Sequence, residues 1–255
     1  MQTAEPYRWI QAGEEWSRPW GSSAAQWHHT IYPRIAACLP AAHILEIACG
    51  FGRWTEYLRR HCDRITAVDS AVECVAACRE RFADDPKVTC LANDGSSLAE
   101  VTDGSVDFAF TFDSLVHTNR ATIKAYLEEL ARVLTSDGRA FVHHSNLGAY
   151  PISAGAKLAK PLRQLTENLR LLTRTNQRAS DMTAELFRAL CHDNGLVCMT
   201  QELINWRSSG LIDCLSWLTR RGSQHERGPT EVRRNRDFMR EAEVIRRRRQ
   251  AETAA

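Results

Sequence analysis

The sequence contains no long apolar segment. Its 255 residues include no stretch of about 18 consecutive apolar residues, so a membrane-spanning helix is not expected. The N-terminus also lacks a basic segment followed by an apolar one, which is the pattern of a secretory signal peptide. We therefore expect a cytoplasmic protein with no membrane span.

An excess of charge of one sign is missing as well. The chain has 33 basic and 31 acidic residues, and its formal net charge is +2. Because nucleic-acid binding needs a strong positive field, the main body is not expected to bind nucleic acid. The tail, residues 220–255, is the exception, with eleven arginines and six acidic residues. We expect this tail to be a solvated appendage, and recruitment of an acidic partner is the alternative.

The nine cysteines form no C-x-x-C pair, which is the spacing typical of zinc and redox sites. Their number is odd, and several lie within apolar segments. This pattern predicts reduced, buried thiols rather than disulfides or a cysteine metal site.

Residues 43–70 are the most informative segment. Two apolar runs, Ile44–Ile47 and Ile65–Val68, predict buried strands, and a glycine turn and a helical stretch lie between them. The second run ends in Asp69. A carboxylate at the end of the second strand of a βαβ unit can accept hydrogen bonds from both hydroxyls of a ribose. The segment therefore predicts binding of an adenosine cofactor.

The glycine turn lacks the G-x-G-x-x-G pattern of dinucleotide sites. Its pattern is Glu46-x-Ala48-x-Gly50-x-Gly52. A carboxylate before the turn would repel a pyrophosphate, but it suits an ammonium or sulfonium ligand. An ordinary glycine-rich turn that binds no ligand is the alternative.

This pattern resembles motif I of the class I S-adenosylmethionine (SAM) methyltransferases, E/D-x-G-x-G-x-G, with Ala48 in place of the first glycine. The resemblance implies SAM as the cofactor and S-adenosylhomocysteine as its product. It also implies an α/β fold: a Rossmann-like, seven-stranded sheet with helices on both faces and a final antiparallel strand. Glu46 would lie near the methionine amine, and Asp69 and Asp94 would bind the ribose and the adenine. The full set of expected cofactor-binding residues is Glu46, Ala48, Gly50, Gly52, Asp69, Ser70, Asp94, Gly95 and Phe112.

Polar residues follow the fourth and fifth predicted strands. Residues 106–112 lead into Asp113 and His117, and residues 139–146 include His143 and His144. Because the carboxyl ends of parallel strands line the ligand crevice, we expect one of these two histidines to face it. His144 is our first choice as general base and His143 the second, with Asp113 or His117 orienting the base or the acceptor.

Two alternatives to this assignment stay open. A histidine at a strand end can serve only as a hydrogen-bonded core residue. A divalent metal such as Mg²⁺ could instead acidify the acceptor, although no ligand spacing demands one.

The resemblance organises the chain as one methyltransferase domain, residues 1–255. Its expected parts are an N-terminal lid segment with a helix over 23–39 (1–40), a SAM-binding core (41–147), a substrate cap (148–180), a final helix and two strands (181–219) and the basic tail (220–255). Simple anchoring of the terminus is the alternative to a lid. Asp181 is expected to cap the final helix, and Arg163, Arg170, Arg174 and Arg178 to offer donors to a polar or anionic substrate.

Four further strings resemble a subgroup of bacterial methyltransferases of glycan and surface-polysaccharide synthesis: residues 20–23, 112–117, 141–146 and 178–182. The resemblance implies methyl transfer to a hydroxyl of a small saccharide, such as a short mannoside. The alternatives are a natural-product acceptor, an RNA or protein acceptor held by the tail, and a SAM-binding protein without catalysis. A homodimer also stays open.

Overall fold

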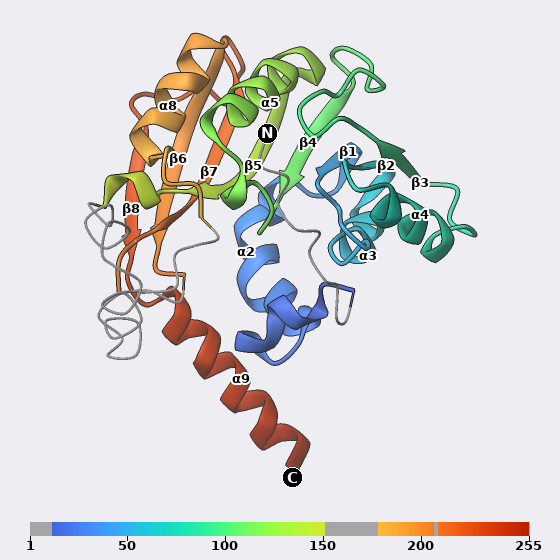
Figure 1. Ribbon diagram of the computed structural model, residues 1–255, viewed down its shortest axis with the longest axis vertical. Coiled ribbons are helices and arrows are strands. Elements are labelled where there is room, and N and C mark those ends of the chain that lie inside the picture. Colours follow the sequence, from blue (N-terminus) through green and yellow to red (C-terminus); the bar gives the residue numbers. More distant parts are fainter. Residues whose placement is uncertain (1–11, 151–177, 207–208, 255) are drawn as a thin grey trace, which may run out of the picture.

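The computed structural model describes residues 12–150, 178–206 and 209–254. Its centre is a mixed eight-stranded sheet in the order β3-β2-β1-β4-β5-β7-β6-β8 (Figure 1). The strands are β1 Ala41–Ile47, β2 Cys62–Asp69, β3 Val88–Ala92, β4 Val106–Thr111, β5 Leu134–Ser145, β6 Leu196–Ile204, β7 Asp213–Arg220 and β8 Glu231–Asn235.

Five strands on one side of the sheet are parallel, and β7 is antiparallel to both of its neighbours, β5 and β6. This confirms the expected antiparallel strand. The expected count of seven strands is wrong, because β8 pairs in parallel with the edge strand β6. All but the last residue of β8 are exposed, so the segment carries no apolar alternation that would predict a strand.

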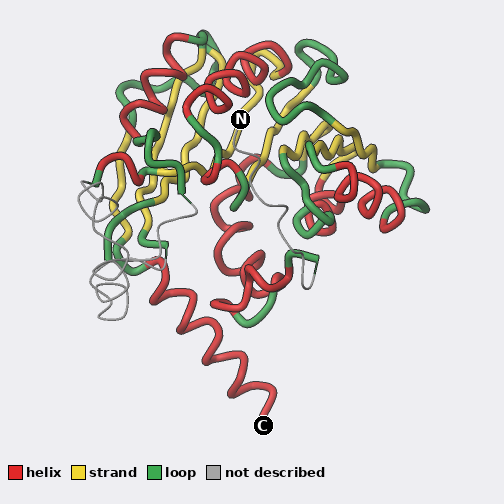
Figure 2. Tube along the Cα trace, viewed as in Figure 1, coloured by secondary structure: helices red, strands yellow, loops and turns green. Residues whose placement is uncertain are grey.

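Helices cover both faces of the sheet (Figure 2). They are α1 Ser23–Gln26, α2 Tyr32–Ile35, α3 Thr55–Leu58, α4 Val72–Arg81, α5 Arg120–Val133, α8 Ala184–Asp193 and α9 Phe238–Ala254. On one face, α5 and α8 bury apolar side chains such as Leu127 and Phe187. On the other face, aromatic side chains such as Phe108 and Phe110 of β4 pack with the N-terminal helices.

The N-terminal segment packs on the aromatic face of the sheet. After a 3-10 helix, Glu14–Trp20, the chain is helical without a break from Ser23 to Cys38, which confirms the helix expected over 23–39. Trp20 and Trp27 are almost completely buried. This burial anchors the terminus, whereas its role as a lid stays a prediction.

The basic tail is more than an appendage. Phe238, in the first turn of α9, is buried, and its ring packs against Trp20 and Trp206. Ala242, one turn later, is buried too. The distal part of α9 extends away from the sheet (Figure 1). The first turns of α9 therefore add to the core, whereas many other described residues of the tail are exposed.

Two other expectations concern the segment around residue 180. Most of the expected substrate cap, including Arg163, Arg170 and Arg174, lies outside the described residues. Asp181 does not cap the final helix, because the Thr183 side chain accepts from the N–H of Leu186 there. Asp181 instead accepts a hydrogen bond from the N–H of Arg120, at the start of α5.

All nine cysteines are buried and none is in a disulfide, as the sequence predicts. Across the three described ranges, no helix is both long and apolar enough to span a membrane.

Candidate active site

The turn after β1 has the conformation that its glycines predict. Gly50 and Gly52 have φ angles of 55° and 77°, and Ala48, in place of the usual glycine, has a φ of 59°. A Cβ at Gly52 would lie 2.5 Å from the Phe82 ring, so this position excludes any side chain. Ala48 adopts the left-handed conformation although it carries a Cβ, which costs about 1–2 kcal/mol.

Asp69 ties this turn to the end of β2. Its Oδ2 accepts from the N–H of Gly50 at 2.8 Å, and its Oδ1 accepts from the N–H of Ala71 at 2.9 Å. Each carboxylate oxygen can accept more than one hydrogen bond, so both can still receive a ribose hydroxyl. The exposed Ser70 lies beside Gly95, whose added Cβ would be 3.5 Å from that of Ser70.

Asp94 forms a tight turn after β3. Its Oδ1 accepts from the N–H groups of Ser96 and Ser97, and these bonds hold the pKa of Asp94 below its usual value. The Asn93 amide is turned away, toward the Ser97 carbonyl and the Tyr126 hydroxyl. A hollow of about 400 Å³ adjoins this turn, and its lining includes Val68, Leu91, Asn93, Asp94, Leu98 and Val101.

Glu46 lies beneath the glycine turn and is only 2% exposed. Thr55, in the first turn of α3, donates its hydroxyl hydrogen to Oε2 of Glu46 at 2.5 Å. Burial raises the pKa of Glu46 to about 8, because the Thr55 hydrogen bond and the Arg53 charge only partly offset its desolvation.

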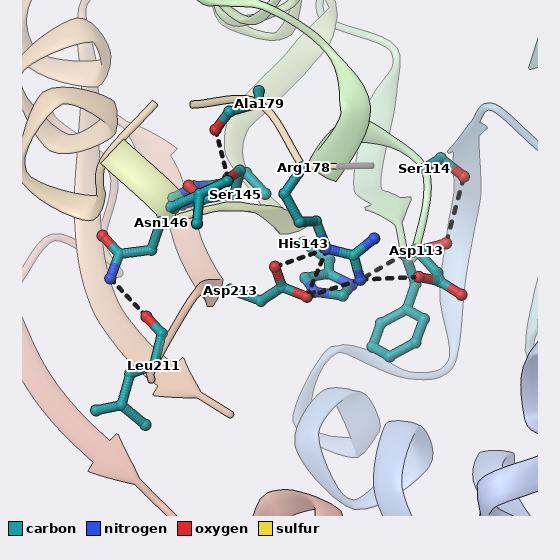
Figure 3. A network of polar contacts seen from close by, with 12 residues as sticks. Asp113, Ser114, His143, Ser145, Asn146, Arg178, Ala179, Leu211 and Asp213 are labelled. Carbon is teal, nitrogen blue, oxygen red and sulfur yellow. Dashed lines mark hydrogen bonds and ion pairs between the residues drawn. The ribbon is translucent and has the colours of Figure 1, made fainter. Parts of the chain in front are cut away.

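Asp113 follows β4 at the centre of a buried polar cluster (Figure 3). Its φ is 64°, and its N–H donates to Nδ1 of His143 at 3.0 Å. The side chain is 3% exposed, with Oδ2 3.7 Å from Nη2 of Arg53 and Oδ1 3.8 Å from Nη2 of Arg178. Oδ1 is buried without a hydrogen-bond partner among the described residues.

The next residue links this cluster to the glycine turn after β1. Ser114 donates its hydroxyl hydrogen to the carbonyl of Ala48 at 3.2 Å. Arg53 connects Asp113 to the N-terminal segment, since its Nη1 donates to the Gly13 carbonyl and to Oγ of Ser17.

His143 lies on the aromatic face of β5 and is completely buried. Its ring centroid is 4.8 Å from that of Phe112 and 5.3 Å from that of Trp206. Nε2 is 3.2 Å from Oδ2 of Asp213, and Arg178 donates from Nε and Nη2 to the same carboxylate. Burial alone would raise the pKa of Asp213, but the bond from His143 and the Arg178 charge bring it below its usual value.

His144 points to the opposite face of the sheet. Its ring stacks on Phe187 with centroids 3.8 Å apart, Nδ1 donates to the Ser145 carbonyl, and Nε2 accepts from the Ser216 hydroxyl. Burial lowers the pKa of His144 to about 3. These contacts argue against our first choice of His144 as the base and fit the alternative of a hydrogen-bonded core histidine.

The other polar residues expected at these strand ends have different positions. His117 is exposed, at the end of the short 3-10 helix Leu115–His117. Ser145 donates to the Ala179 carbonyl, and the Asn146 amide donates to the Leu211 carbonyl. Both therefore hold neighbouring chain segments in place. Among the described residues, no three or more His, Cys, Asp or Glu side chains are grouped to hold a metal ion, so the Mg²⁺ alternative finds no ligand set there.

Sequence reasoning missed Arg53, Trp206 and Asp213 as members of the cluster. Asp213 could have been found, because an antiparallel β7 begins at the edge where β5 ends, and Asp213 is its first residue. Arg53 and Trp206 carry no such signal, since each reaches the cluster from a turn.

Comparisons with known proteins bear on the fold of the chain. Residues 44–138 match a family described as a methyltransferase domain. No curated protein matches the sequence.

Solved structures give the same fold. A putative methyltransferase of Haloferax volcanii, in complex with its activator Trm112, is 18% identical, with a TM-score of 0.56 and coverage of 84% of this chain and 98% of that one. The N-methyltransferase NodS of Bradyrhizobium japonicum, in complex with S-adenosylhomocysteine, is 15% identical (TM-score 0.55; 86% and 93% covered). A geranyl diphosphate methyltransferase in complex with SAM is 14% identical (TM-score 0.54; 78% and 85% covered). Residues 44–138 thus match a methyltransferase domain, and the chain has the Rossmann-like α/β fold of these methyltransferase structures.

Proposed function

We propose that the protein transfers the methyl group of SAM to a hydroxyl of a small saccharide, with Asp113 accepting the hydroxyl proton. The observation that carries this proposal is Oδ1 of Asp113, a buried carboxylate oxygen without a hydrogen-bond partner in the described part of the chain. Leaving such an acceptor unpaired costs about 1–3 kcal/mol or more, so it is expected where a ligand supplies the missing donor. The atom is covered in this structure, so an acceptor could reach it only if neighbouring side chains moved.

The neighbours of Asp113 favour a hydroxyl over an amine as the methyl acceptor. Two buried arginines, Arg53 and Arg178, have guanidinium nitrogens 3.7 and 3.8 Å from its carboxylate. Most aliphatic amines are cations at neutral pH, and the two arginines offset the charge of the Asp113 carboxylate that would attract them. A neutral hydroxyl does not depend on such an attraction.

The cofactor would bind along the carboxyl ends of β1 to β4. Glu46 would meet the methionine ammonium, Asp69 the ribose hydroxyls and Asp94 the adenine, with the adenine entering the hollow beside Leu91. Phe112 would border the methyl group. SAM supplies an electrophilic methyl, and the oxygen–methyl bond forms as the methyl–sulfur bond breaks. The hydroxyl proton passes to Asp113, and S-adenosylhomocysteine leaves as a neutral thioether.

The family likeness does not extend to the acceptor. The similar structures include an N-methyltransferase and a geranyl diphosphate methyltransferase, both below 16% identity. The saccharide acceptor therefore follows from the sequence resemblance and from the charges around Asp113. A natural-product hydroxyl is the nearest competing acceptor.

A turnover assay with an acceptor panel tests the proposal. Formation of S-adenosylhomocysteine would be followed with short mannosides, unmethylated and partly methylated, with other sugars, and with primary amines of similar size. We expect turnover with a saccharide, none with the amines, and no dependence on added Mg²⁺. Turnover with an amine alone would refute the hydroxyl assignment.

A further inference from the structure

We propose that His143 is a positioning residue that fixes the backbone of Asp113, with Asp213 fixing His143 in turn, and that it does not take the acceptor's proton. This inference rests on the proposed function, in which Asp113 takes that proton. The three residues come from the ends of β4 and β5 and the start of β7 (Figure 3).

The first step concerns the backbone of Asp113. Its φ of 64° is a left-handed conformation, which is unfavourable for a non-glycine residue. The hydrogen bond from its N–H to Nδ1 of His143 offsets part of this cost. Without an acceptor at Nδ1, this N–H would lose its partner and the left-handed conformation would lose its support.

The second step concerns the hydrogen atoms of the imidazole. Because Nδ1 accepts from a backbone N–H, it carries no hydrogen, and the ring hydrogen lies on Nε2. Nε2 donates this hydrogen to Oδ2 of Asp213, which also binds Arg178 through two nitrogens. The ionised Asp213 therefore selects the tautomer that leaves Nδ1 free to accept.

The third step concerns access. Both ring nitrogens are in use, and the ring packs against Phe112 and Trp206 with no exposed surface. A substrate hydroxyl would have to displace one of these bonds to reach either nitrogen. Oδ1 of Asp113 is covered too, but it has no hydrogen-bond partner among the described residues, so a hydroxyl could bind it without displacing a hydrogen bond.

Two variants of His143 separate positioning from proton transfer. In His143→Asn, the amide oxygen can occupy the place of Nδ1 and accept from the Asp113 N–H, but it cannot serve as a base. In His143→Leu, the acceptor is lost and the volume is kept. We expect His143→Asn to retain kcat within about 5-fold and to keep the wild-type pH profile. We expect His143→Leu to lose about 100-fold in kcat while its Kd for SAM stays within about 3-fold, because a misplaced catalytic group costs about that much.

Two results would overturn the inference. If His143→Asn is as inactive as His143→Leu while both bind SAM, the imidazole itself does the chemistry. If both variants turn over as the wild type does, the contact to Asp113 has no role.

A spectroscopic measurement tests the inference even if no methyl acceptor is known and the His143→Leu variant does not fold. In ¹⁵N NMR of the wild-type protein at neutral pH, Nδ1 of His143 should give the shift of an unprotonated acceptor and Nε2 that of a protonated nitrogen. The reverse tautomer, or a doubly protonated ring, would refute the inference. A different result would show that the proposed function is wrong. In that case Asp113→Asn would turn over fully while the ¹⁵N spectrum of His143 stays unchanged.

Discussion

The hydroxyl of Thr55 donates to Oε2 of Glu46 at 2.5 Å, beneath the turn that would hold the methionine end of SAM. This bond alone does not keep Glu46 ionised, because burial raises its pKa to about 8. At neutral pH the free protein therefore holds a proton on Glu46, although the proposed ammonium contact needs the carboxylate.

SAM binding should accordingly release a proton. The arriving ammonium would lower the pKa of Glu46, so the affinity for SAM should rise with pH up to about pH 8 and level off above it, where Glu46 is already ionised in the free protein. Calorimetry in buffers of different ionisation enthalpy should show this release for the wild type and not for Glu46→Gln. A binding enthalpy independent of the buffer would contradict the contact between Glu46 and the ammonium.

Ionisation of the buried Glu46 should also lower the stability of the free protein at high pH. The unfolded chain ionises Glu46 near pH 4.5 and the folded chain only near pH 8, so stability falls as the pH rises across this window. Glu46→Gln keeps an acceptor for Thr55 and removes the ionisation. Its Tm should therefore exceed that of the wild type by more at pH 8 than at pH 5. An equal difference at both pH values would show that Glu46 ionises normally.

Gly52→Ala should destabilise the protein more than Gly104→Ala, a matched substitution elsewhere in the chain. A Cβ at Gly52 would lie 2.5 Å from Phe82 and 2.9 Å from Sγ of Cys78, whereas one at Gly104 would have nothing within 4 Å. Both glycines have positive φ, so both substitutions share the backbone cost of about 1 kcal/mol. Urea unfolding should show an extra loss of about 1–3 kcal/mol for Gly52→Ala. Equal losses would refute the steric account.

His144 should make the protein acid-sensitive. Its pKa is about 3 when folded and near 6.5 when unfolded, so its contribution is present above pH 6.5 and is lost as the pH falls. The loss at pH 4.5 should be about 2–3 kcal/mol relative to pH 7. In His144→Asn, the difference in unfolding free energy between these pH values should shrink by this amount. An unchanged difference would show that His144 is accessible to protons in the folded state.

The arginine run in α9 should be dispensable for turnover of a small acceptor. Replacing Arg246 to Arg249 with glutamine leaves Phe238 and Ala242, the buried residues of the same helix, in place. We expect kcat within about 2-fold of the wild type, with little change between low and high salt. A large loss of activity would favour a nucleic-acid acceptor, because phosphate contacts release counterions.

Much of the fold could be predicted from sequence because the parallel strands are buried on both faces and appear as apolar runs. The apolar runs Ile44–Ile47 and Ile65–Val68 fall within β1 and β2, as predicted. The exposed β8 has no such run. It forms because β6 would otherwise present an unpaired edge, which is a property of the assembled sheet.

Part of the candidate site could also be predicted from the sequence, because two of its residues lie at the ends of predicted strands. The ends of β4 and β5 locate Asp113 and His143, which meet through one hydrogen bond. Choosing between His143 and His144 requires knowing which face of β5 each occupies, and alternation alone leaves this open. Asp213 lies 70 residues from His143 in sequence, so only the pairing of β5 with β7 brings them together.

The most direct test of the account is Asp113→Asn, since asparagine tolerates the left-handed conformation and keeps the shape of the side chain. Single-turnover methylation of the active saccharide, with the Kd for SAM measured in parallel, would separate chemistry from cofactor binding. We predict a rate lower by about 10²–10⁴-fold, the usual worth of a general base, with the Kd for SAM within about 3-fold of the wild type. A variant that methylates the saccharide at the wild-type rate would contradict the assignment of Asp113 as the proton acceptor.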